Sequence, residues 1–114
     1  MAIAVATTKQ TVCNAYTAIG NYIGCATADP GTTSTPANES SGGGYARLTT
    51  TWTPGSGGVS NGSATTINLP ASTVTFMFVA TAATGNTMFD KASIGSNVLS
   101  TAGQLVITPT MTVT

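Results

Sequence analysis

Residues 74–81, Val-Thr-Phe-Met-Phe-Val-Ala-Thr, carry the strongest indication of the fold class of this chain. Alternate residues of a β-strand point to opposite faces, and here both faces carry large apolar side chains. Phe76 and Phe78 share one face, and Met77 and Val79 share the other. A strand that is apolar on both faces is typical of a sheet covered on both sides. We therefore predict that residues 74–81 form the most buried strand.

Turn signals bound this strand on both sides. Pro70 follows residues 64–69 and cannot continue a central ladder, so these residues are predicted to be a short strand that ends there. On the other side, residues 83–86 (Ala-Thr-Gly-Asn) predict a turn, and residues 87–91 a return strand. Residues 104–113 are the last predicted strand, and Pro109 indicates a bulge or an edge position within it.

Residues 45–52 also alternate with period two, and they predict a further strand. Tyr45 and Arg47 share one face of it, while Leu48 and Trp52 share the other. Residues 54–62 are rich in Gly and Ser and predict a turn region. Five or six short strands with such spacing indicate an all-β, mainly antiparallel fold, either a β-sandwich or a jelly-roll-like barrel. The 24 threonines agree, because β-branched side chains suit strands.

One short N-terminal helix precedes the strands in this prediction. Four apolar residues fall at i, i+4, i+7 and i+11, on one helical face: Val12, Tyr16, Ile19 and Ile23. Thr7 or Thr8 is the expected cap, and Gly20 and Gly24 place the expected end near residues 21–22. A strand starting at Tyr16 or Tyr22 is the alternative. The apolar face either packs on the sheet or docks on a neighbouring subunit.

The chain of 114 residues has the length of a single domain, which we assign to residues 1–114. Residues 1–8 are apolar and uncharged and predict an N-terminal arm. The strong turn Asp29-Pro30-Gly31 introduces residues 32–44, which have almost no apolar side chain to bury and predict a long surface loop.

Charge is the unusual feature of the composition. The chain has three basic residues, three acidic residues and no histidine. Three scattered basic residues cannot neutralise the phosphates of a nucleic acid, and a serine or cysteine hydrolase would lack its usual base. A zinc site would have only Cys13 and Cys25 as soft ligands. The longest apolar run is too short to span a membrane. We therefore expect no enzyme, no cofactor, no nucleic-acid partner and no membrane partner, with both cysteines free rather than bridged.

The few polar candidates each have a structural and a functional interpretation. Arg47 is expected to pair with Glu39 or Asp29 and so to hold the long loop against the sheet, in preference to binding an anion. Trp52 is expected to fill the core, although Tyr45 and Trp52 together would suit a sugar. Asp29 and Glu39 are too few carboxylates to indicate a calcium site.

Short motifs across the chain from about Val12 onward resemble a known family. In order they are Ala28-Asp29-Pro30-Gly31-Thr32-Thr33, Asn38-Glu39, Gly43-Gly44-Tyr45-Ala46-Arg47, Trp52, Leu69-Pro70-Ala71, Ala82-Ala83-Thr84-Gly85 and Ala102-Gly103-Gln104. This order resembles a family of small virion surface proteins of tailed actinobacterial bacteriophages, which are labelled as tail-fibre or capsid-decoration proteins. The sequence departs from the family at residues 25–27, where a His often stands, and at residues 79–81, where a Trp is common. Those departures put a shared binding role of these positions in doubt.

The resemblance implies a non-enzymatic structural protein of the virion. The leading hypothesis is a capsid decoration or minor capsid protein, made in the host cytoplasm, which binds the outer surface of the capsid lattice and stabilises it. Its expected partners are the major capsid protein and further copies of itself, with a homotrimer as the expected assembly. The alternatives are a tail-fibre or tail-tip component that contacts the host surface, and a carbohydrate-binding module that binds a host-surface glycan. The candidate interface residues are Met1, Ala2, Ile3, Val5, Tyr45, Arg47 and Trp52.

Overall fold

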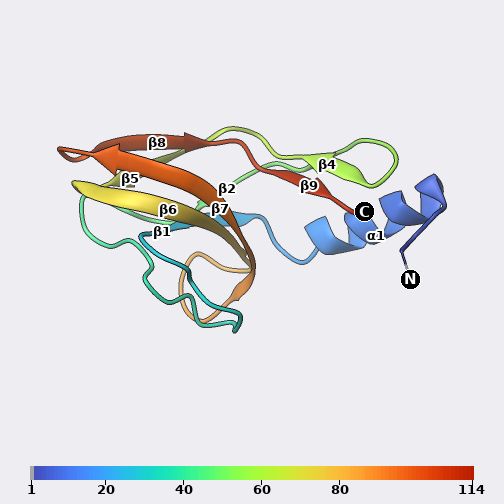
Figure 1. The fold of residues 1–114 in the computed structure, drawn as a ribbon, viewed down its shortest axis with the longest axis horizontal. Helices are drawn as coiled ribbons and strands as arrows, with labels where there is room; N and C mark the ends of the chain where they lie inside the picture. Colours follow the sequence, from blue (N-terminus) through green and yellow to red (C-terminus); the bar gives the residue numbers. More distant parts are fainter. Residues whose placement is uncertain (1) are drawn as a thin grey trace.

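The computed structural model describes residues 2–114, as one helix followed by nine strands (Figure 1). The helix is α1 (Ala6–Thr17). The strands are β1 (Tyr22–Ala26), β2 (Leu48–Thr49), β3 (Thr53–Pro54), β4 (Val59–Asn61), β5 (Thr65–Leu69), β6 (Ser72–Ala80), β7 (Met88–Leu99), β8 (Gly103–Ile107) and β9 (Thr110–Thr112). The paired strands are antiparallel, which confirms the predicted fold class with its single short N-terminal helix.

The strands form open sheets, and they do not close into the barrel that was one alternative. The largest sheet has the order β2-β1-β6-β7, a second has the order β3-β4-β9, and β5 pairs with β8. The main core lies between the first sheet and the β5–β8 pair. Its buried residues come from both layers: Ile23, Cys25, Val74, Met77 and Val79 from the first, and Ile67, Leu69 and Ile107 from the second.

Strand β6 is buried on both faces, as its pattern predicts. Met77 and Val79 belong to the main core, while Phe78 and Ala80 form a second buried cluster with Met88. Gly24 lies opposite Phe78 in the ladder. A Cβ atom at Gly24 would lie 2.3 Å from Cζ of Phe78, so only glycine lets the ring lie across β1.

The helix differs from its prediction in length and in its buried face. It ends at Thr17, and the alternative prediction of a strand from Tyr22 is correct, because Ile23 is a core residue of β1. Val5 precedes the helix and makes no side-chain cap, so neither Thr7 nor Thr8 is the cap. The face toward the molecule carries Cys13, which is the buried residue of α1. The helix packs mainly on β4 and β9, and Tyr16 near its end also contacts Phe89 and Asp90 of β7, so much of its surface stays exposed.

The segment after the long loop also differs from its prediction. Within residues 45–52 only β2 is a strand, and it is two residues long. Arg47 is 5% exposed and Leu48 is 40% exposed, so Leu48 does not join Trp52 in the core. The side chain of Arg47 points inward because its hydrogen-bond acceptors lie inside the molecule. The next residue, Leu48, therefore points outward. Trp52 still packs against the main core.

Several other strand boundaries also differ from the predicted ones. Residues 54–62 contain the β3–β4 hairpin as well as a turn, and the return strand β7 extends to Leu99. Pro109 separates β8 from β9, so the expected single last strand is two strands in different sheets. Residues 32–44 form a loop, and Glu39 makes an isolated bridge with Ala26. No helix in residues 2–114 is long and apolar enough to cross a membrane.

Candidate functional site

The most highly connected polar group of the molecule is the guanidinium of Arg47. Its Nε donates to Oε2 of Glu39 at 2.8 Å, and Nη2 donates to Oε1 of the same carboxylate at 2.9 Å. This is the bidentate geometry that gives an arginine–carboxylate pair its strength. The hydrogen bonds that Arg47 donates to Glu39 raise the pKa of Arg47 above its ordinary value.

The other donors of Arg47 hold a second segment of chain. Nη1 donates to the carbonyl of Ala82 and to Oγ1 of Thr87, and Nη2 also donates to the carbonyl of Gly85. All five N–H donors of the guanidinium are therefore used. Its carbon lies 5.1 Å from the centre of the Phe78 ring, so Arg47 also covers the second cluster. The residue joins the loop 32–44, the turn 81–87 and strand β6.

Tyr45 completes this cluster. Its hydroxyl donates to Oε2 of Glu39 at 2.7 Å and accepts from the backbone N–H of Cys25 at 3.1 Å. Burial of the phenol raises the pKa of Tyr45. The structure thus brings Glu39, Tyr45 and Arg47 together as a set whose polar atoms are satisfied within the chain. Such an arrangement stabilises a loop and leaves few groups free to bind a ligand.

Trp52 lies in a different environment from Tyr45. Its Nε1 donates to the carbonyl of Gly20 at 3.1 Å, and its ring packs against the main core. Both aromatic side chains are half-buried, and each uses its polar atom in an internal hydrogen bond. This geometry does not form the shared, exposed aromatic platform that a sugar would require.

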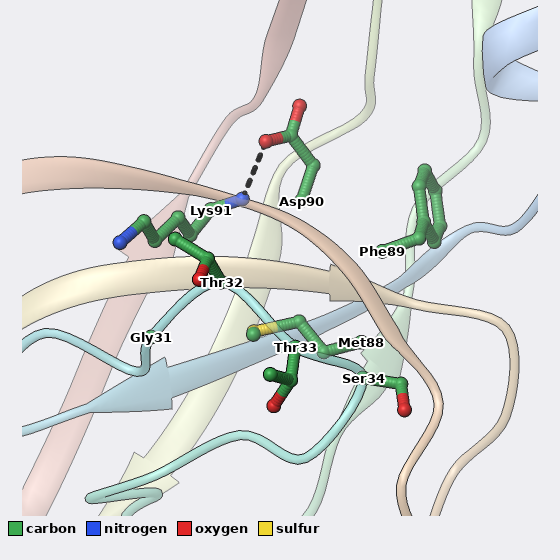
Figure 2. Close-up of a pocket in the computed structure, with 8 residues that line it drawn as sticks. All are labelled: Gly31, Thr32, Thr33, Ser34, Met88, Phe89, Asp90 and Lys91. Atoms are coloured by element: carbon green, nitrogen blue, oxygen red, sulfur yellow. Dashed lines mark hydrogen bonds between the residues drawn. The ribbon is translucent and has the colours of Figure 1, made fainter.

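A hollow of about 290 Å³ lies between the loop residues 31–34 and the start of β7 (Figure 2). Figure 2 shows Thr32, Thr33 and Ser34 on the loop and Met88, Phe89, Asp90 and Lys91 on strand β7, with the Asp90 carboxylate pointing away from the loop. Both charges have partners, because Lys91 pairs with Asp29 and Asp90 accepts from the hydroxyl of Tyr16. The pairing with Lys91 holds the pKa of Asp29 below its ordinary value. The hollow is lined by the hydroxyl groups of Thr32, Thr33 and Ser34 and also by the apolar side chains of Met88 and Phe89.

Two contacts near this hollow have no signal in the sequence. Tyr16 and Asp90 are 74 residues apart, and the Tyr16 ring also meets Phe89, the residue before Asp90, edge to face. Only the packing of α1 beside β7 brings them together. Within residues 2–114, no group of three or more potential ligands gathers for a metal ion.

Cys13 and Cys25 are both free and buried, as expected. Burial raises the pKa of Cys13, and burial with the nearby charge of Glu39 raises the pKa of Cys25 to about 12. The thiols are therefore protonated and shielded at neutral pH. They act as small apolar side chains of the core.

The candidate interface residues divide into two groups in space. Met1 lies outside the described residues, and Ala6 to Thr8 form the first turn of α1, so the arm is confined to residues before Ala6. Ala2 and Val5 are exposed, and Ile3 is half-buried. The N-terminus lies at the helical end of the molecule, far along its longest axis from the loop 32–44 (Figure 1). Arg47 is buried, so its side chain contacts only this chain.

A family model described as podophage GP4 fiber I protein gp80 matches residues 5–113. The chain belongs to this family. No curated protein and no solved structure matched the chain. The family confirms the resemblance at the level of a phage fibre-type virion protein, and it identifies a fibre-related structural protein of a bacteriophage.

Proposed function

We propose that this fibre-type protein is a non-enzymatic subunit on the outside of the virion, bound to the capsid lattice by its helical end. The family match over residues 5–113 is the observation that carries the proposal. The shape supports it, because the molecule measures 46 × 25 × 23 Å and α1 and both termini lie at one end of the long axis (Figure 1). An elongated body attached at one end projects its sheets away from the surface.

The charge distribution also supports a repeated, crowded arrangement. Two ion pairs and the Tyr16–Asp90 hydrogen bond engage five of the six charged side chains. Lys9 is the one charged residue in residues 2–114 without such a contact. A surface with so little free charge repels its copies weakly, so many copies fit side by side on a lattice. The contact with the major capsid protein is then apolar and nearly independent of salt.

The copy number of the chain per purified particle tests this location. Quantitative mass spectrometry against the major capsid protein is expected to give about one copy per capsid subunit, or one per three. A handful of copies per particle would overturn the capsid location in favour of a tail fibre or tail tip. In that case the hollow of Figure 2 becomes the surface to test for host-glycan binding. Complete absence from the particle would overturn a virion role.

The N-terminal arm is the segment that we assign to the contact with the lattice. Ala2 to Val5 are uncharged, precede the helix and lie at the attached end. Deleting residues 2–5 leaves every strand and the core intact, so the protein is expected to fold and to be lost from purified particles. A matched variant, Thr32→Ala in the exposed loop, is expected to keep full occupancy. Equal occupancy of the deletion variant would show that the arm is not the attachment.

A further inference from the structure

The main core is open on one side, between strand β7 and strands β8 and β9. Of the eight buried residues that form this core within residues 2–114, Met77, Val79 and Ile107 are 7%, 6% and 7% exposed, and the other five are fully buried. These three residues line two further hollows, of about 310 and 410 Å³. Met77, Ala92 and Pro109 line both hollows, so the two form one continuous groove with core residues at its floor.

The walls of this groove are edge strands. β7 is the last strand of the sheet β2-β1-β6-β7, β9 is the last strand of the sheet β3-β4-β9, and β8 pairs with β5 on one side. The free side of an edge strand presents a row of backbone N–H and C=O groups without a strand partner. The groove therefore combines apolar surface with hydrogen-bonding groups at the spacing of a β-strand. An extended peptide is the ligand that uses both.

Strand β8 (Gly103–Ile107) is the edge that lacks protection against pairing. Edge strands are usually shielded by shortness, charge, proline or a bulge. β2 and β3 are two residues long, β9 is three residues long, and β7 carries Asp90 and Lys91 and shifts its register with β6. The outer side of β5 is covered by β2 and by Gly43, which lies against the backbone that follows Leu69. By contrast, β8 is five residues long, pairs with β5 without a register shift and contains no charge and no proline.

The side chains beside β8 define the chemistry of the ligand. Val106 is 59% exposed, and it lines the larger hollow together with the half-buried Ile94 and Leu105. Of the described residues that line this hollow, none is charged. A charged segment would lose hydration there without gaining a partner, so the ligand is uncharged. Alternate residues of a strand face one side, so every second residue is apolar and lies on the floor.

We propose that the groove binds one extended, uncharged segment of a partner protein, which pairs with β8 as an added strand and covers Met77 and Ile107 with apolar side chains. The groove has an edge strand on each side. A free segment has two edges to offer, whereas an edge strand inside a folded sheet of a second copy has only one. The occupant is therefore a free segment. This inference goes beyond the proposed function and does not depend on where the protein sits on the particle.

Titration of the isotope-labelled chain with a synthetic peptide, followed by amide NMR, tests the groove. The probe is an acetylated peptide of alternating threonine and valine, six residues long, with a Gly/Ser tail for solubility. It is expected to bind with a dissociation constant below about 1 mM and to slow hydrogen exchange of the β8 amides. A control peptide of the same sequence with every amide N-methylated keeps the side chains but cannot donate to a strand edge. It is expected to bind at least about tenfold more weakly.

A pair of matched variants locates the binding. Val106→Asp places a charge beside the added strand and is expected to weaken binding of the peptide at least about tenfold. Val98→Asp is the control, because Val98 is 71% exposed on β7 and lines neither hollow. Both side chains are exposed, so both variants are expected to keep the native circular dichroism spectrum.

Three results would overturn the proposal. They are no binding at about 1 mM peptide, equal affinity for the N-methylated peptide, and equal loss of affinity in the two variants. A native chain that dimerises through a contact sensitive to Val106→Asp, and that excludes the peptide as a dimer, would also overturn it and would identify a second copy as the occupant. Sedimentation equilibrium with and without the peptide measures this.

Discussion

At the scale of single residues, Arg47 is the side chain that covers Phe78 and the second buried cluster of the largest sheet. It is 5% exposed and makes five hydrogen bonds, to the carboxylate of Glu39 and to the segment Ala82–Thr87. A buried charge is tolerable only when its donors are satisfied. The pair therefore determines where the loop 32–44 lies on the sheet.

Replacing Arg47 with alanine is expected to lower the free energy of unfolding by about 3–5 kcal/mol, because it leaves Glu39 without its partner and uncovers Phe78. Arg47→Lys is expected to recover only part of this loss, since an ammonium cannot reproduce the planar fork. Urea denaturation followed by circular dichroism measures both. Lys91→Met is the matched control, because it removes one positive charge from an exposed pair with Asp29. Equal losses for Arg47→Ala and Lys91→Met would contradict this explanation.

At the scale of elements, α1 is attached to the strands by very few contacts. Oε1 of Gln10 accepts from the N–H groups of Gly58 and Val59 at 3.0 and 3.1 Å, and Sγ of Cys13 lies 3.8 Å from the carbonyl of Met111. A helix of this length is marginal in isolation, so these contacts decide whether it forms.

Gln10→Ala is expected to lower the free energy of unfolding by about 1–3 kcal/mol, because two backbone donors lose their acceptor. Amide hydrogen exchange is expected to accelerate at Gly58, at Val59 and along α1, with little change in β6. Thr11→Ala, on the exposed side of the helix, is the control. Unchanged protection at Gly58 and Val59 would show that Gln10 does not anchor the helix.

At the scale of the whole molecule, stability is expected to be almost constant between about pH 5 and 8 and to fall above about pH 9. No histidine is present to titrate near neutrality. Burial raises the pKa of Cys25 from 9.0 to about 12, so above pH 9 the folded chain holds a proton that the unfolded chain loses. The burial-raised pKa values of Tyr16 and Tyr45 act in the same direction at higher pH.

Urea denaturation over a pH series measures this profile. Cys25→Ala is expected to be less stable overall and to lose less stability between pH 9 and 10 than the native chain, because it removes one of the groups that titrate there. At the acid end, the lowered pKa of Asp29 predicts a small loss as the pH falls through and below its ordinary value near 4. A native profile that stays flat up to pH 11 would contradict the assignment of Cys25 as a buried, protonated thiol.

The parts of the fold predicted correctly are those with strong local patterns. Residues 74–81 alternate apolar side chains on both faces, and they form the buried strand β6. Pro70 ends β5 as expected, and both cysteines are free. The end of the helix was predicted wrongly, and the burial of Arg47 beside an exposed Leu48 was not predicted, because each depends on a distant contact. Ile23 lies in β1 because the main core lies there. Arg47 points inward because, besides Glu39, it donates to three acceptors that are 35 to 40 residues away.

The exposed surface shows the same distinction between local sequence patterns and distant contacts. Alternation, composition and motif order are properties of the chain alone, so they were enough to predict the fold class, the near absence of charge and the resemblance to phage virion proteins. Which apolar residues stay exposed depends on how the elements pack in three dimensions. Val12 and Ile19 looked like the core face of a helix, yet the body of the molecule contacts Cys13 and Gln10 instead. The faces of α1 have similar polarity, so the strands that pack against the helix determine which face is buried.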